Sequence, residues 1–197
     1  MNKRSFLNLT ALGVSGLSVA MEADAAGSKS LRSPALLTVT GLIGAGNRGA
    51  LDPALDQMMV KQKIKFDKAQ IFDFAALAAM PAISIKPTLE YDNQPHTLKG
   101  PLLMDVMKAC GVKVTDKTML FLRAVDGYAV PISAADAARY RFILATHLDG
   151  KPMPLGGLGP LWAVYDADRY ADMAAKPISA RFALCPWATY HVDVKDA

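Results

Sequence analysis

The residues of this chain that could do chemistry include a polar turn and three histidines. The turn, residues 90–96, begins Glu90-Tyr91-Asp92, so two carboxyl groups flank one phenol. Carboxyl groups two residues apart in a turn are usually solvated, and we interpret this pair as part of a surface turn. The histidines, His96, His147 and His191, lack the close spacing to one another or to cysteine that is typical of zinc sites. No serine lies in a nucleophile-elbow context. The residues alone therefore identify neither a catalytic set nor a metal site.

A glycine-rich segment offers a second kind of chemistry. Residues 44–49 match the pattern G-x-G-x-x-G and follow an apolar run, residues 36–43, that predicts a first strand. In dinucleotide-binding folds this pattern opens a helix, and an acidic residue lies about 20 positions further on. Here Pro53 falls early in the expected helix, and that later position lies in a charged run, residues 61–67. We interpret the segment as a glycine-containing turn, with a nicotinamide enzyme as the alternative.

The element that must position any site is the central unit, residues 97–133. Gly100-Pro101 ends an extended segment, and residues 102–110 have mostly helical apolar spacing. Gly111 follows where a left-handed helix cap is expected. Residues 119–125 and 128–132 are rich in strand-forming residues and are joined by Asp126-Gly127, which predicts a β-hairpin.

Shorter elements surround this unit. Helices are expected within residues 52–63, 66–80, 134–140 and 166–173. Strands are expected at residues 83–91 (broken by Pro87), 141–147 and 161–165, with one or two closing strands in residues 178–194. The pattern is mixed, rich in strands and without repeats, and it predicts an α+β fold.

The N-terminus predicts export. Residues 1–25 combine Lys3 and Arg4 with an uncharged, largely apolar run and a small-x-small cleavage site, as in a signal peptide. We therefore expect a signal peptide (1–25), a linker (26–34) and one domain (35–197), located in the periplasm or secreted, with no membrane span once the signal is removed. Both a twin-arginine-like signal, with lysine as its first basic residue, and an ordinary secretion signal fit these residues. In an oxidising compartment Cys110 and Cys185 could form a disulfide or remain buried free thiols.

Composition narrows the classes of partner. The chain has 197 residues, 52% of them apolar, and a formal net charge of +4. Its basic residues are scattered, whereas a nucleic-acid groove needs a stripe of Lys and Arg with interleaved aromatic residues. We therefore expect no nucleic-acid partner, while a small anionic ligand is compatible with the charge.

The order of segments resembles a known family. TLKGPLLMDVMKACGV, LFLRAVDGYAVPIS, ILATHLDGKPM and GPLWAVY follow one another as in the oxidoreductase molybdopterin-binding domain of the sulfite oxidase superfamily. The resemblance covers roughly residues 35–194. The resemblance implies a strand-rich α+β domain of the sulfite oxidase molybdopterin-domain type. It also implies molybdopterin as a cofactor, which no other feature of the sequence indicates.

The chain departs from that family at one position. Active members ligate molybdenum through a cysteine in a T-L-x-C type segment, and here Thr88-Leu89-Glu90-Tyr91 places Tyr91 at that point. Neither Cys110 nor Cys185 matches the position of that ligand cysteine. A neutral phenol is a much poorer ligand for molybdenum than a thiolate.

The sequence is thus similar to short exported members that lack the cysteine. This resemblance implies a non-catalytic binding or accessory module. A pocket near Tyr91, His96, Arg123 and Tyr128 would hold a small anionic ligand or a periplasmic protein partner. The alternative is a molybdopterin-dependent oxidoreductase whose cofactor is held by other groups, which a twin-arginine signal would suit.

Overall fold

The computed structural model describes residue 31 and residues 33–197. The predicted signal peptide, and with it most of the predicted linker, lies outside the described residues. Within them the chain has an α+β fold rich in strands, which confirms the predicted class. Its helices are α1 (Gln57–Lys61), α2 (Phe74–Ala78), α3 (Leu103–Ala109), α4 (Ala134–Arg139) and α5 (Ala171–Ala174), with 3-10 turns at Ala167–Arg169 and Ile178–Ala180. Its strands are β1 (Ala35–Gly41), β2 (Gln70–Asp73), β3 (Ala82–Ile85), β4 (Leu98–Pro101), β5 (Thr118–Ala124), β6 (Ala129–Ser133), β7 (Ile143–Ala145), β8 (His147–Leu148), β9 (Lys151–Pro152), β10 (Trp162–Val164) and β11 (Thr189–Asp196).

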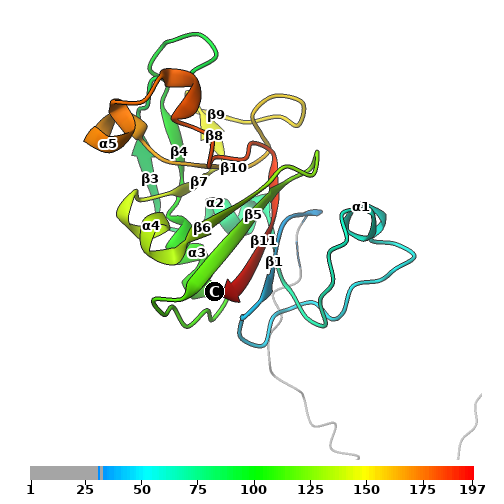
Figure 1. The fold of residues 1–197 in the computed structure, drawn as a ribbon. Coiled ribbons are helices and arrows are strands. Elements are labelled where there is room, and N and C mark those ends of the chain that lie inside the picture. Colours follow the sequence, from blue (N-terminus) through cyan, green and yellow to red (C-terminus); the bar gives the residue numbers. More distant parts are fainter. Residues whose placement is uncertain (1–30, 32) are drawn as a thin grey trace, which may run out of the picture.

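The largest sheet joins the two ends of the described chain. Its strand order is β2-β1-β11-β5-β6, and β1 pairs with β11 in parallel while the other pairs are antiparallel. Figure 1 shows β1 and β11, blue and red, side by side in the middle of this sheet. Because side chains alternate along a strand, Leu120 and Leu122 of β5 face the core and Arg123 faces the opposite side.

The core lies between this sheet and two smaller ones. These have the orders β10-β7 and β3-β4-β8-β9 among the described residues. Helix α4 packs against β5 and β6 of the large sheet, and α3 packs against α4 (Figure 1). Aromatic side chains fill the centre: Trp162 and Phe142 are fully buried, and the rings of Phe142 and Tyr165 stack with their centroids 4.8 Å apart. Burial of this kind stabilises the fold by about 25 cal/mol per Å² of apolar surface removed from water.

The central unit forms as the sequence predicts. Helix α3 is followed by Gly111 with a φ of +71°, a conformation that costs an L side chain strain energy. Strands β5 and β6 form a hairpin in which the Gly127 N–H donates to the Ala124 carbonyl oxygen at 3.0 Å and Gly127 has a φ of +94°. The Ala124 N–H donates to the Tyr128 carbonyl oxygen at 2.8 Å, so residues 125–127 form the closed loop, which ends in a left-handed glycine.

Several expected elements are shorter than the segments in which the sequence predicts them. Residues 66–80 contain β2 before α2, because Asp73 accepts a hydrogen bond from the Ala76 N–H and so begins the helix only at Phe74. In residues 52–63 only Gln57–Lys61 is helical. The C-terminal segment becomes a strand only at Thr189, so Cys185 lies in the turn before β11 and not in a strand.

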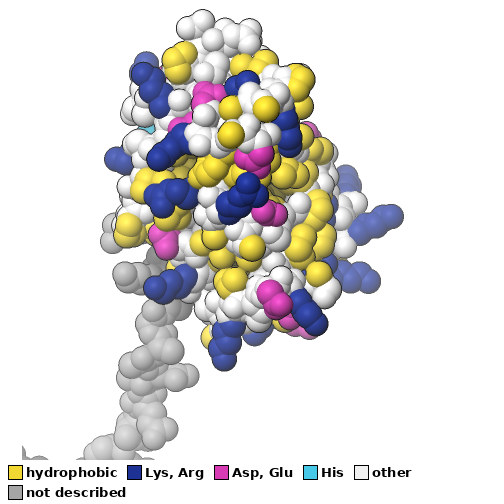
Figure 2. All heavy atoms as spheres, turned by 60° about the vertical axis from the view of Figure 1, so that its left-hand side comes forward, with side chains coloured by type: hydrophobic (Ala, Val, Ile, Leu, Met, Phe, Trp, Pro, Cys, Tyr) yellow, Lys and Arg dark blue, Asp and Glu magenta, His cyan; other side chains and the backbone are white. Residues whose placement is uncertain are grey.

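One face of the molecule has the scattered charge that the sequence predicts. On the face drawn in Figure 2, Lys and Arg side chains are spread among apolar and neutral ones and form no continuous stripe. Across the part of the chain that the structure describes, no helix has the length and apolar character needed to cross a membrane.

Candidate functional site

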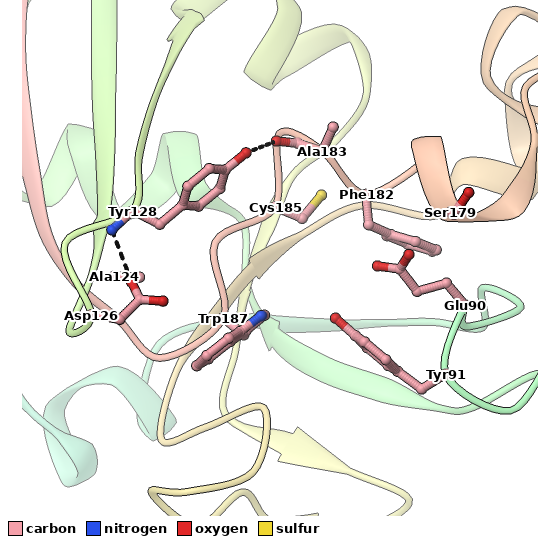
Figure 3. A pocket seen from close by; sticks show the side chains of 10 residues that line it. All are labelled: Glu90, Tyr91, Ala124, Asp126, Tyr128, Ser179, Phe182, Ala183, Cys185 and Trp187. Atoms are coloured by element: carbon pink, nitrogen blue, oxygen red, sulfur yellow. Dashed lines mark hydrogen bonds between the residues drawn. The ribbon is translucent and has the colours of Figure 1, made fainter.

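A pocket of about 310 Å³ lies where three segments meet. The loop between β3 and β4 supplies Glu90 and Tyr91, the β5–β6 hairpin supplies Asp126 and Tyr128, and the segment before β11 supplies Cys185 and Trp187. Figure 3 shows these side chains around the pocket. Tyr91, which stands where the family resemblance implies a metal-binding cysteine, lines this pocket.

The loop that carries Glu90 and Tyr91 is a tight turn with a buried anchor. Leu89 is 3% exposed, and its N–H donates to the Gln94 carbonyl oxygen at 2.9 Å. The Thr88 N–H donates to Asp168 Oδ2 at 2.7 Å, which fixes the entry to the turn. The turn therefore holds Glu90 half-buried and Tyr91 more than half exposed at the rim of the pocket.

His96 closes this loop but does not line the pocket. Its Nδ1 lies 2.7 Å from Asp149 Oδ2, and its Nε2 lies 2.8 Å from Asp92 Oδ2. These two carboxylates hold the pKa of His96 above its ordinary value, because the protonated ring donates to both. In return, hydrogen bonding to His96 lowers the pKa of Asp92 and of Asp149. His96 thus ties the loop to the β8–β9 turn.

The hairpin side of the pocket is also held by hydrogen bonds. Asp126 Oδ1 accepts from the Tyr128 N–H at 2.8 Å, so Asp126 has the turn-forming role that the sequence predicted. The Tyr128 hydroxyl donates to the Ala183 carbonyl oxygen at 2.7 Å (Figure 3). Tyr128 therefore joins the hairpin to the segment that precedes β11.

That segment supplies the sulfur group of the pocket and two of its aromatic rings, Phe182 and Trp187. The Trp162 indole N–H donates to the Cys185 carbonyl oxygen at 2.9 Å and anchors the segment to the core. Trp187 is 40% exposed, and its indole nitrogen points toward the Tyr91 hydroxyl (Figure 3). No short-range pattern in the sequence indicated that Cys185 and Trp187 would line a pocket with Tyr91.

The titratable groups of the pocket are largely neutral or acidic. Burial raises the pKa of the Cys185 thiol, which is therefore protonated at neutral pH. Partial burial and the neighbouring Glu90 carboxylate raise the pKa of Tyr91 to about 12. Neither group is an anionic ligand for a soft metal under ordinary conditions.

The four residues expected to share a pocket are divided between different places. Tyr91 and Tyr128 line the pocket described above, His96 lies beside it, and Arg123 lines a second cavity. Arg123 is directed away because it lies on the face of β5 opposite the core, cross-strand from His191.

The pocket does not fit a molybdopterin group. That group carries a phosphate, and no Lys or Arg is among the described residues that line this pocket, whereas Glu90 and Asp126 are acidic. Arg181, close in sequence, is bound instead to Asp168 Oδ1 at 2.8 Å and to the Ala174 carbonyl oxygen. Among the described residues no cluster of His, Cys, Asp and Glu has the arrangement of a metal site.

The glycine segment and the thiols have structural roles. The Gly44 N–H donates to the Cys110 carbonyl oxygen at 2.8 Å, and the N–H groups of Asn47 and Arg48 donate to Ala69. These N–H groups are occupied within the protein, and the next helix begins only at Gln57, which supports the turn interpretation over a dinucleotide loop. Cys110 and Cys185 are buried free thiols, the second of the two expected alternatives.

Comparison with known proteins places the fold but not a family. No family model matches the chain, and no curated protein has a significantly similar sequence. Among solved structures, the sulfane dehydrogenase SoxCD from Paracoccus pantotrophus matches with a TM-score of 0.53 and 12% identity. The match covers 82% of this chain and 38% of that chain, so this chain spans well under half of its structural neighbour. At this identity the likeness shows a shared fold alone.

Proposed function

We propose that the protein is an exported, non-catalytic binding or accessory module built on a molybdopterin-domain fold. The observation that carries this proposal is the pocket beside Tyr91. It holds a neutral phenol, a protonated buried thiol and two acidic side chains where a molybdenum enzyme of this fold would need a thiolate and cationic groups. The periplasmic or secreted location follows from the predicted signal peptide and stays a prediction.

The chemistry of the pocket also indicates its ligand. Glu90 and Asp126 disfavour an anion here, so the small anionic ligand expected from the sequence has no support at this pocket. Trp187 and Tyr91 offer aromatic surface beside a carboxylate, which suits a cationic group with an attached ring. We therefore assign this pocket to a small organic cation.

Metal analysis tests the non-catalytic role. The protein is purified from its native compartment, in cells that load molybdopterin into a control enzyme, and its molybdenum content is measured. We expect molybdenum far below one atom per chain and no pterin absorption band. A near-stoichiometric molybdenum content would overturn the proposal.

The same measurement decides the alternative, a molybdopterin-dependent oxidoreductase without a cysteine ligand. That alternative draws support from the fold shared with a protein named a dehydrogenase. An oxidoreductase of this kind would require the molybdenum that the proposal excludes.

Fluorescence tests the ligand assignment, because Trp187 lines the pocket and Trp162 is fully buried. Benzyltrimethylammonium is titrated against the protein, with benzoate as the anionic counterpart of similar size. We expect saturable quenching by the cation, several-fold weaker binding in Glu90→Gln, and no quenching in Trp187→Phe. Equal binding of benzoate, or unchanged binding in Glu90→Gln, would refute a cation site.

A further inference from the structure

A second cavity, of about 430 Å³, lies on the face of the five-stranded sheet opposite the core. Its floor is formed by β5 and β11, and residues 63–68 form its wall. Two carboxylates, Asp67 and Asp193, line it, and they are outnumbered by five basic side chains, Lys63, Lys65, Lys68, Arg123 and Lys195. The lining therefore has a formal excess of three positive charges.

Only some of these cations are engaged within the protein. Lys195 Nζ lies 2.7 Å from Asp193 Oδ2, and Lys68 Nζ donates to the Ile43 carbonyl oxygen at 3.1 Å. Within residues 33–197, Lys63, Lys65 and Arg123 have no carboxylate within ion-pair distance. These three cations are available to an anion that enters the cavity.

A buried histidine lines the cavity and is held in one tautomer. His191 is 1% exposed, and its Nε2 lies 2.9 Å from Thr40 Oγ1. The Thr40 hydroxyl donates its one hydrogen to Asp193 Oδ1 at 3.1 Å, so it must accept from His191 Nε2–H. The proton of the neutral ring is thus on Nε2, and Nδ1 carries a free electron pair.

Burial keeps this ring neutral. Burial, together with the Arg123 and Lys195 cations, lowers the pKa of His191 to about 4, although Asp193 acts in the opposite direction. At neutral pH, Nδ1 is therefore a hydrogen-bond acceptor, and it has no hydrogen-bond partner among the described residues.

A buried donor without a partner accompanies this acceptor. Arg123 Nε is buried and has no hydrogen-bond partner in the part of the chain that the structure describes, and Arg123 is the direct cross-strand partner of His191. A register shift between Thr189 and His191 sets this pairing, and such bulges commonly re-aim side chains beside functional sites. Unpaired buried polar atoms cost stability, and a group that both donates and accepts would satisfy the two together.

We propose that this cavity binds a small oxyanion that carries a protonated oxygen, of the hydrogen phosphate class. The anion's O–H donates to His191 Nδ1, and a deprotonated oxygen accepts from Arg123 Nε–H. Lys63 and Lys65 supply the remaining positive charge. This site is separate from the pocket beside Tyr91, and it does not depend on the function proposed for that pocket.

Isothermal titration with inorganic phosphate and with sulfate, at pH 7 and constant ionic strength, tests the proposal. The two anions are similar in size and charge, but at this pH phosphate retains a proton and sulfate has none to donate. We expect phosphate to bind at least tenfold more tightly than sulfate. Arg123→Gln should weaken phosphate binding at least tenfold, and Lys65→Gln several-fold.

Two further variants make the outcome specific. Lys151→Gln removes the same charge from exposed β9, outside the cavity, and should change phosphate affinity less than twofold. His191→Gln should reduce the preference for phosphate over sulfate. Three results would overturn the proposal: equal affinity for the two anions, absence of phosphate binding, or an equal loss of phosphate affinity in Lys65→Gln and Lys151→Gln. The cavity would then hold only solvent or attract anions without selectivity.

Discussion

The buried His191 predicts a specific loss of stability in mild acid. In the unfolded chain its pKa returns to about 6.5, whereas burial lowers the folded-state pKa to about 4. Between these values the unfolded chain binds a proton that the folded protein excludes, so stability decreases as the pH falls. Linkage at about 1.36 kcal/mol per pKa unit gives a loss of roughly 2–2.5 kcal/mol in the free energy of unfolding between pH 7 and pH 4.5.

Urea unfolding at pH 7 and pH 4.5, in phosphate-free buffer, measures this loss for the natural protein and for His191→Gln. The variant is less stable at pH 7 because it loses the ring and its Thr40 contact, so the comparison uses only the change with pH. Other titrating groups, including Asp92 and Asp149, are present in both proteins and cancel in that comparison. We expect a decrease that is about 2 kcal/mol larger in the natural protein. Equal decreases would refute the reasoning, since His191 would then be protonated in the folded state.

Two further predictions concern packing and the thiols. A Cβ built on Gly100 would lie 2.0 Å from the Leu144 carbonyl oxygen. Gly100→Ala should therefore destabilise the protein by about 2 kcal/mol or more in urea unfolding. The control is Gly49→Ala, where a Cβ meets no described atom within 4 Å, and it should change the free energy of unfolding by less than about 0.5 kcal/mol. Similar effects in both variants would contradict the close approach of Gly100 to the Leu144 carbonyl oxygen. Burial raises the pKa of Cys110 to about 12 and shields Cys185 from solvent. A thiol reagent should therefore label neither cysteine in the native protein and both cysteines after unfolding without reductant. No labelling after unfolding would contradict this prediction, because it would indicate a disulfide.

Much of the central unit could be predicted because its causes are local. The left-handed conformation at Gly111 and the turn at Gly127 depend on backbone sterics within a few residues, and the alternating burial of β5 depends on its own sequence. The role of Asp126 as a turn former follows from the same short-range chemistry. The α+β class was predictable for the same reason, since it is the sum of such local preferences.

Other boundaries could not be predicted, because tertiary contacts override local preference. Residues 70–73 have a composition that also suits a helix, but they extend to pair with β1 as strand β2. Cys185 lies in an apolar run typical of a strand, yet Trp162 holds its carbonyl group in a turn.

The sequence by itself determined the fold class, the hairpin and the helix cap. Only the tertiary structure decided which side chains share a pocket. It separated Arg123 from Tyr91 and placed it beside His191, 68 positions away, because β5 and β11 pair in one register. The parallel pairing of β1 with β11 then brought Thr40 to His191, 151 positions away. Contacts at such separations depend on strand order and register, which no short stretch of sequence encodes.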